Sequence, residues 1–160
     1  MKTNRTVPHK RKRNGKTDYK KRLELLKSRK PRVVIRTTNS QIIVQIIEYN
    51  PEGDDIVAEA KATDLEEHGW EHNTKNLPAA YLTGLIASQK ADVDEGVLDI
   101  GLQNRHKGGR IYAGLKGVID GGINVPASEE AFPSQQRLEG QHISEDVQED
   151  FQDVKQKVSE

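Results

Sequence analysis

The chain has 160 residues, of which 25 are Lys or Arg, 25 are Asp or Glu and none is Cys. This length suits one domain with tails, and the absence of cysteine excludes a disulfide framework, a thiolate zinc site and a cysteine nucleophile. No apolar run approaches the roughly 20 residues that cross a bilayer, and no apolar core follows the N-terminal charges as in an export signal. We therefore expect a soluble cytoplasmic protein without a membrane partner.

The zero net charge hides a strong asymmetry along the chain. Residues 1–36 hold 15 basic residues and two acids, a net charge of +13. Residues 37–138 hold 8 basic residues and 16 acids, and residues 139–160 hold 2 and 7, which gives net charges of −8 and −5. Such a contrast between the two ends is typical of a nucleic-acid-binding arm attached to an ordinary domain.

The apolar residues are segregated as well. The segment from Arg32 to Val125 is rich in Leu, Ile and Val, whereas the first 20 residues contain Val7 alone. Because a segment this polar cannot bury enough surface to offset its ordering entropy, we expect residues 1–17 to be an extended basic arm that orders mainly on a partner. A helix follows, with Asp18 as its N-cap, from Tyr19 to about Ser28.

The next segment predicts a β-hairpin. Arg32–Thr38 is a β-branched strand, Asn39-Ser40 supplies a two-residue turn in which Asn39 tolerates positive φ, and Gln41–Tyr49 is the return strand. The apolar residues of Gln41–Tyr49 fall on both faces, which predicts a central strand covered on both sides.

A strand–helix–strand unit comes next. Ile56–Ala62 predicts a strand with one wet face, Asp64–His68 a helical turn closed by Gly69, and Asn76 to about Lys90 a helix with one stripe of small and apolar residues that packs on the sheet. Val97–Leu102 is a short strand. This order implies a right-handed crossover with the two strands parallel.

Two further helices complete the predicted fold. Arg110–Ile119 follows the polar loop Gln103–Gly109 and ends at Gly121-Gly122. Ser144–Val158 is an acidic amphipathic helix with apolar residues at helical spacing. The fold class is therefore α/β, with a small mixed sheet and helices packed on it.

The density of positive charge in the arm predicts nucleic-acid binding. An extended chain covers roughly 3.3 Å per residue, so the arm can follow several phosphates and release their counterions. RNA is favoured over DNA because no helix-turn-helix, zinc finger or leucine zipper is present to enter a major groove. Tyr19 either stacks on a base or packs against Leu23.

A second basic segment precedes the helix that starts at Arg110. In Arg105–Arg110, Gly108 and Gly109 would let a phosphate approach the backbone N–H groups of the helix N-terminus, although the nucleotide-binding spacings GxxxxGK[ST] and GxGxxG are absent. This segment is either a second phosphate contact or an ordinary exposed loop.

Catalysis is not expected. His68 and His72 lie four residues apart, but Gly69 breaks the helix between them and no third metal ligand is near. Two-metal nuclease chemistry needs several converging carboxylates, and Asp99 is the only acid inside a predicted strand. We expect no catalytic residue, no metal, no cofactor and no small-molecule substrate.

Five segments of the chain have distinctive amino-acid sequences. They are GKTDYKKRLELLKSRKPRVVIR (Gly15–Arg36), NLPAAYLTGLIASQKA (Asn76–Ala91), VLDIGL (Val97–Leu102), GGRIYAGLKGVIDGGINVP (Gly108–Pro126) and RLEGQHI (Arg137–Ile143). In this order and spacing they resemble the archaeal branch of the ribosomal protein L-eighteen family, over roughly Val7 to Ile143.

The resemblance implies a ribonuclease-H-like topology without catalytic function. It also implies a structural protein of the large ribosomal subunit that binds 5S rRNA and attaches it to 23S rRNA in the central protuberance, beside ribosomal protein L-five and other proteins of that region. The domain organisation is then an arm over 1–17, an α/β RNA-binding domain over 18–143 and an acidic C-terminal helix over 144–160. That helix continues past the end that the resemblance implies. Three possibilities stay open for it: it folds back on the domain, contacts a neighbouring molecule, or extends into solvent.

For this sequence, the resemblance implies RNA contacts along the arm, around the first strand and in the loop with Gly108 and Gly109, which we term the glycine loop. These residues are Arg5, Lys10, Arg11, Lys12, Arg13, Lys16, Tyr19, Lys20, Arg22, Arg32, Arg36, Thr37, Asn39, Arg105, Lys107, Gly108, Gly109 and Arg110. The alternatives are a DNA-binding or RNA-chaperone protein outside the ribosome, and a nuclease.

Overall fold

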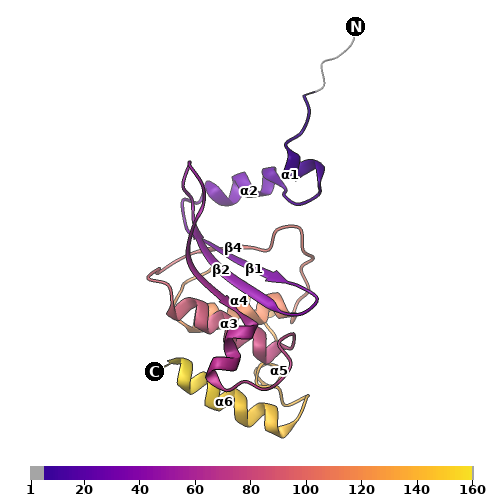
Figure 1. Ribbon diagram of the computed structural model, residues 1–160, viewed down its shortest axis with the longest axis vertical. Coiled ribbons are helices and arrows are strands. Elements are labelled where there is room, and N and C mark those ends of the chain that lie inside the picture. Colours follow the sequence, from indigo (N-terminus) through magenta and orange to yellow (C-terminus); the bar gives the residue numbers. More distant parts are fainter. Residues whose placement is uncertain (1–5, 160) are drawn as a thin grey trace.

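A four-stranded mixed sheet forms the centre of the molecule (Figure 1). A computed structural model describes residues 6–159, and its strands are β1 (Arg32–Thr37), β2 (Ile42–Glu48), β3 (Asp55–Lys61) and β4 (Val97–Asp99), in the order β3-β2-β1-β4. β1 and β2 pair antiparallel, as do β2 and β3, whereas β4 pairs parallel to β1. The predicted mixed sheet and hairpin are confirmed. β3 and β4 run in the same direction, as predicted, but two strands separate them. The strand order alone does not establish the ribonuclease-H-like topology, which stays a prediction.

The turn between β1 and β2 is held by Thr38 and not by a left-handed Asn39. The Thr38 hydroxyl donates to the Gln41 carbonyl at 2.9 Å and accepts from the Ser40 and Gln41 N–H groups at 3.3 and 3.0 Å. Among the described residues other than glycine, only Arg29 has a positive φ. The prediction of a positive φ at Asn39 was therefore wrong, because a side-chain hydroxyl closes the turn instead of an unusual backbone conformation.

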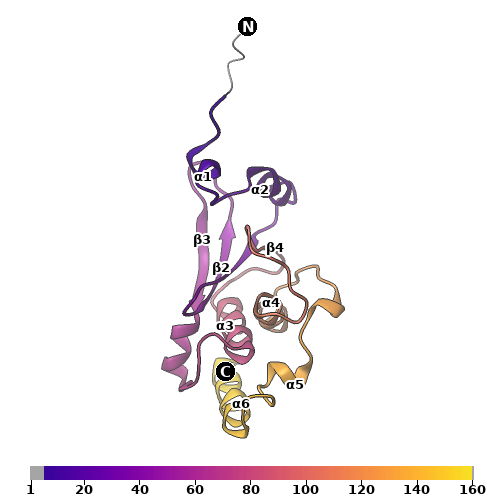
Figure 2. The same cartoon turned by 90° about the vertical axis from the view of Figure 1, so that its right-hand side faces the viewer.

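Two helices cover one face of the sheet. The face built by Val33, Ile35 and Val44 is fully buried against α3 (Leu77–Gln89) and α4 (Arg110–Asp120). The far face is covered only in part, since Val34 and Ile47 on it are buried but Ile43 and Gln45 are half-exposed. β2 is central, as predicted, but the predicted coverage on both sides is incomplete, because the N-terminal segment with α2 (Tyr19–Leu26) lies over that face and leaves part of it exposed (Figure 2).

Helices α3 and α4 cross with their backbones in contact. A Cβ atom added at Gly84 of α3 would lie 2.0 Å from the Gly114 carbonyl oxygen, and one at Gly117 of α4 would lie 2.0 Å from the Tyr81 carbonyl oxygen. The glycines of α3 and α4 therefore serve this crossing, whereas we expected the small residues of α3 to face the sheet. Twelve of the thirteen α3 residues are buried, so the predicted single stripe is wrong: the helix is covered on all sides.

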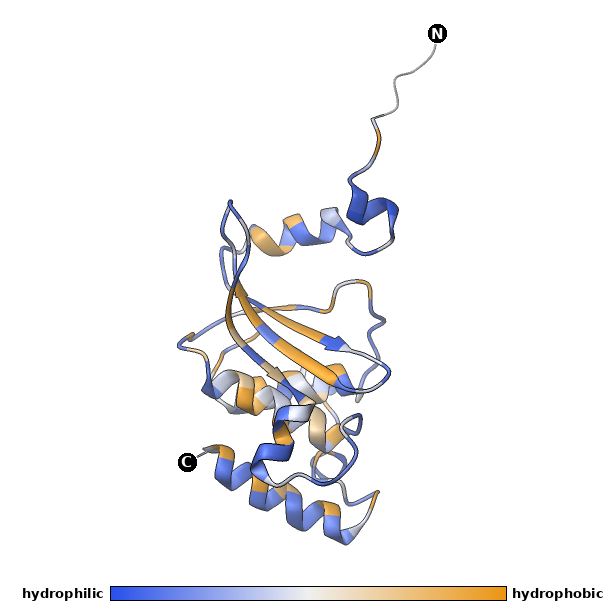
Figure 3. Ribbon diagram, viewed as in Figure 1, coloured by the Kyte–Doolittle hydropathy of each residue, from blue (hydrophilic) through white to orange (hydrophobic). Residues whose placement is uncertain are grey.

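The C-terminal helix α6 (Glu145–Ser159) supplies the cover on the remaining side of α3 (Figure 3). Val147, Phe151 and Val154 are buried, and the ring of Phe151 lies 5.5 Å from that of Tyr81. His72 Nε2 lies 2.7 Å from Asp150 Oδ2, which ties the helix to the loop before α3. Of the three possibilities for this segment, the structure shows that it folds back.

The N-terminal segment is more structured than the predicted extended arm. Lys10–Arg13 forms a single helical turn, α1, that bonds back to the His9 carbonyl. Asp18 caps α2 as predicted, by accepting from the Lys20 and Lys21 N–H groups at 3.0 and 3.2 Å, but α2 ends at Leu26 and buries no residue.

Three short helices complete the structure. These are η1 (Ala62–His68), closed by Gly69 as predicted, and two that we did not predict, η2 (Glu129–Ala131) and α5 (Gln135–Leu138). Within residues 6–159, no helix combines the length and the apolar character that crossing a membrane requires.

Candidate nucleic-acid interface

The basic residues of α1 and the turn after it are exposed and lack carboxylate partners. Lys10, Lys12, Arg13, Lys16 and Lys20 form no ion pair within the described part of the chain, and the Arg11 guanidinium donates only to the Thr17 hydroxyl, at 2.9 Å. The ring of Tyr19 lies 5.0 Å from that of His9. Arg5 lies outside the described residues. The segment therefore presents a group of unneutralised positive charges.

Arg32 differs from these cations because it is buried. Only 3% of its surface is exposed, and its guanidinium bonds to Asp99 at 2.9 Å and to Asp54. Asp54 also accepts from Arg22 at 2.8 Å. In the free chain, Arg32 therefore offers very little surface to an RNA, and the contact that the resemblance implies for it stays a prediction. Its role is to bind the two carboxylates that join β1, β4 and the loop before β3.

Asp99 is the carboxylate on which these contacts converge. Burial alone would raise the pKa of Asp99, but the Gly101 N–H bond and the Arg36 and Arg32 guanidinium groups outweigh burial and lower the pKa below its ordinary range. The carboxylate is therefore ionised at neutral pH. Within residues 6–159, no three His, Asp or Glu side chains gather as they would around a metal ion.

A basic surface, which we term the arm patch, lies above Asp99. Its exposed and half-buried cations are Arg11, Lys16, Lys21, Arg22 and Arg36, which line a small hollow of about 140 Å³ together with the buried Arg32 and the carboxylates of Asp18 and Asp99. The Lys21 ammonium donates to the Gly101 carbonyl at 2.9 Å and holds α2 against the end of β4. The Arg36 guanidinium donates to the Asp99 carbonyl at 2.9 Å, and its side chain remains 37% exposed. The fold thus joins the arm to the end of β1.

Gln103 joins the same end of β1 to the glycine loop. The N–H and the hydroxyl of Thr37 both donate to Gln103 Oε1, at 2.8 and 2.7 Å, and Gln103 Nε2 donates to the Ile35 and Ile100 carbonyls at 2.8 and 3.0 Å. This amide fixes the start of the loop Gln103–Gly109. The sequence analysis missed Gln103, because one glutamine in a polar segment carries no recognisable signal.

The predicted loop residues lie on the surface. Arg105 and Lys107 are exposed, and Lys107 pairs with the equally exposed Glu130 at 3.2 Å. Gly108 has φ of +67°, which a residue with a side chain rarely adopts, and its N–H donates to the Ala131 carbonyl at 2.8 Å. Gly109 then begins α4. Asn39 is exposed at the tip of the first hairpin.

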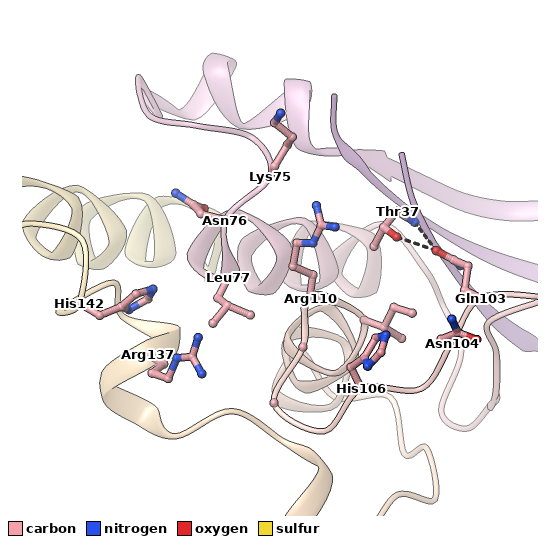
Figure 4. A pocket seen from close by; sticks show the side chains of 13 residues that line it. Thr37, Lys75, Asn76, Leu77, Gln103, Asn104, His106, Arg110, Arg137 and His142 are labelled. Carbon is pink, nitrogen blue, oxygen red and sulfur yellow. Dashed lines mark hydrogen bonds between the residues drawn. The ribbon is translucent and has the colours of Figure 1, made fainter. Parts of the chain in front are cut away.

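Between the loop, α3 and α5 lies a cavity of about 620 Å³, which we term the basic hollow (Figure 4). Its lining includes Lys75, Arg110 and Arg137 and the imidazoles of His106 and His142, and it contains no carboxylate. Arg110 stands in the middle, with Arg137 and His142 on one side and Thr37 and Gln103 on the other. Lys75, Arg137 and His142 were not among the residues singled out in the sequence analysis because each stands alone among polar and acidic residues, and only the fold brings them together.

The arm patch and the basic hollow meet at the end of β1, where Arg36 lines the first and Thr37 the second. The acidic helix α6 lies at the end of the molecule opposite α1 (Figure 1). The cations of the arm patch and of the basic hollow thus follow one route, from α1 across the end of β1 to the hollow. This arrangement suits a polyanion such as a nucleic acid.

Comparison with known proteins identifies the family of this chain. A family model described as "Ribosomal large subunit proteins 60S L5, and 50S L18" matches residues 4–96. A protein from Korarchaeum cryptofilum named large ribosomal subunit protein uL18 is 55% identical over 141 residues, which cover 86% of this chain and 72% of that protein. Proteins of the same name from Haloarcula marismortui and Methanothrix thermoacetophila are 46% identical over 142 residues (87% of this chain, 76% of that protein) and 42% identical over 159 residues (95% and 94%).

The chain belongs to the uL18 family of large ribosomal subunit proteins. The resemblance seen in the sequence is confirmed. The chain is therefore a structural protein of the ribosome, in the cytoplasm. It is not an enzyme, so the nuclease alternative is rejected.

Proposed function

We propose that the chain binds 5S rRNA and attaches it to 23S rRNA in the central protuberance, beside ribosomal protein L-five. The observation that carries this proposal is the group of exposed, unpaired cations from Lys10 to Lys20. Unneutralised charges held this close together repel one another, and a folded RNA relieves that repulsion. Membership of the uL18 family makes ribosomal RNA the nucleic acid in question.

In this proposal the arm supplies most of the affinity and the glycine loop sets the orientation. The contacts are the accessible members of the set that the resemblance implies, namely Lys10, Arg11, Lys12, Arg13, Lys16, Tyr19, Lys20, Arg36, Asn39, Arg105, Lys107 and Arg110, with Gly108 and Gly109 admitting a phosphate to the backbone. We leave out Arg32 because it is buried, and Arg22 because both oxygens of Asp54 accept from it at 2.9 and 2.8 Å, whereas the carboxylate pairs of Arg36 and Lys107 are longer, at 3.6 and 3.2 Å.

The test is the salt dependence of binding to a 5S rRNA transcript. Replacement of Lys10, Arg11, Lys12 and Arg13 with Ala removes about four phosphate contacts, so the slope of log K against log salt should fall by about 3. The matched control exchanges the same residues in kind (Lys10→Arg, Arg11→Lys, Lys12→Arg, Arg13→Lys) and should keep the slope. An unchanged slope in the Ala variant would refute the role of the arm.

Binding to the RNA and residence in the ribosome are separate claims. If the protein acted outside the ribosome as a DNA-binding or RNA-chaperone protein, it would not sediment with large subunits from a cell extract. We expect it to sediment with them at moderate salt, and to release 5S rRNA together with the protein when the subunits are washed at high salt.

A further inference from the structure

The basic hollow is lined by cations that do not belong to the arm. Arg110, Arg137 and Lys75 line it; Arg110 is half-buried, whereas Arg137 and Lys75 are exposed at its edge (Figure 4). Within residues 6–159, none of these three side chains has a hydrogen bond or an ion pair, and no carboxylate lines the cavity. Elsewhere in the structure, carboxylates accompany buried or half-buried arginines, as Asp54 accompanies Arg22 and Arg32. The hollow therefore carries uncompensated positive charge in a concave site, where the field is strongest.

The backbone adds donors to the same site. Helix α4 begins at its edge with Gly109, which provides no side-chain cap, and the first helical bond is from the Ala113 N–H to the Gly109 carbonyl at 3.0 Å. The N–H groups of the first turn have no acceptor within the helix. In α3, by contrast, the side chain of Asn76 caps the Ala79 N–H at 2.8 Å. Cations and free N–H groups together favour an oxyanion such as a phosphate.

The position of the hollow identifies the source of that phosphate. Thr37 on its wall directly follows Arg36 of the arm patch, so an RNA strand that follows the arm patch past the end of β1 comes next to the hollow. A volume of about 620 Å³ lies within the range of cavities that hold a small ligand, so there is room for a nucleotide and its phosphate. Leu77 and Ile111 give it a buried apolar floor on which a sugar or base can rest.

We propose that the basic hollow binds a backbone phosphate of large-subunit rRNA, with Arg110, Arg137 and Lys75 as its cationic ligands. The proposal rests on the proposed function in that it takes ribosomal RNA as the partner. It goes further by assigning contacts to Lys75 and Arg137, which lie 62 residues apart along the chain.

The first test compares two triple variants that each lose three positive charges. Lys75→Ala, Arg110→Ala and Arg137→Ala remove the proposed ligands, whereas a control carries Lys61→Ala, Lys90→Ala and Lys157→Ala on β3, at the end of α3 and on α6. For binding to rRNA, the ligand variant should lower the log–log salt slope by about 2 to 3, and the control should lower it by less than about 1. Equal slopes for the two variants would overturn the proposal.

The second test does not depend on the stability of a triple variant. Because the chain has no cysteine, His142→Cys places one unique attachment point for a photo-crosslinker at the hollow, and Gln152→Cys places the control on the exposed face of α6. Each labelled protein is irradiated with a 5S transcript and, separately, with 23S rRNA. We expect an RNA crosslink from position 142 with at least one of the two RNAs, and none from position 152.

The outcomes separate the two proposals. Absence of a crosslink from position 142 with both RNAs overturns the hollow as an RNA site, even if the protein binds 5S rRNA through the arm. If the wild-type protein ignores the 5S transcript but position 142 crosslinks to 23S rRNA, the hollow is supported and the proposed attachment of 5S rRNA fails.

Discussion

The carboxylate of Asp99 lies 2.9 Å from Nη1 of Arg32, and both side chains are almost completely buried. The pair joins the parallel strands β1 and β4 next to the surface where the arm patch forms. Arg36 approaches the other oxygen of Asp99 at 3.6 Å, so one carboxylate holds two arginines of β1, one of them inside the sheet and one exposed.

Removing the charge of Asp99 should destabilise the fold. In Asp99→Asn the amide can still accept from the Gly101 N–H, but Arg32 loses one of its two carboxylates in a buried site. We expect the free energy of unfolding to fall by about 3 kcal/mol, as for other buried ion pairs that lose one partner. Urea denaturation of the wild-type protein and of Asp99→Asn measures this difference in the free energy of unfolding. In Glu95→Gln, which breaks the exposed pair with Lys30, the loss should stay below about 1 kcal/mol.

The same pair should make stability depend on acid pH. The pKa of Asp99 is lowered in the folded protein, so its contribution is fully present above the ordinary Asp pKa of about 3.9 and is lost as pH falls through the lower, folded pKa. The difference in unfolding free energy between the wild-type protein and Asp99→Asn should therefore be largest near pH 7 and shrink below pH of about 4. A difference that is constant from pH 7 to acid pH would contradict this role.

The backbone contact between α3 and α4 predicts opposite results for two glycines of one helix. Gly117→Ala places a Cβ 2.0 Å from the Tyr81 carbonyl oxygen, so the helices must separate, at a cost of about 1–3 kcal/mol. Gly114→Ala finds its nearest atom at 3.4 Å, an ordinary contact, and gains helix propensity of about 0.5–1 kcal/mol. Thermal unfolding of both variants checks the order; equal melting temperatures would count against the crossing.

The C-terminal helix should contribute to stability and not behave as a tail. Phe151→Ala removes a fully buried ring that contacts Tyr81, and we expect a loss of about 3–5 kcal/mol. Gln152→Ala, at the neighbouring exposed position, should change the free energy of unfolding by less than about 0.5 kcal/mol. If Phe151→Ala unfolds at the wild-type urea concentration, the helix does not pack on α3 in solution.

Patterns local in the sequence predicted the fold well. The cap at Asp18, the crossover helix after Asn76 and the closing glycines at 69 and 121–122 are each set by neighbouring residues, and each is found within a few residues of its predicted place. The errors concern contacts between distant segments. The burial of α3 on all sides depends on the position of α6, which lies about 70 residues further along the chain. The periodicity of apolar residues within α3 does not indicate that α6 covers it.

The candidate site shows the same division. The cations from Lys10 to Lys20 form one dense run and were found from charge alone. The burial of Arg32 and the gathering of Lys75, Arg137 and His142 depend on which strands and helices meet, and the sequence contains no local pattern for either. Arg32 and the neighbouring arginines look alike in the sequence, and only the carboxylates of Asp54 and Asp99 distinguish them.

The separation of cationic α1 from acidic α6 affects how the protein meets its partner. Since the formal net charge is zero, a distant polyanion exerts little net pull on the chain, but it exerts a torque on an electric dipole that runs along the molecule. Within about one Debye length, ~8 Å at physiological ionic strength, that torque turns the N-terminal end inward and the α6 end outward. Encounters therefore begin in one orientation, and raising the ionic strength should slow productive association by randomising it.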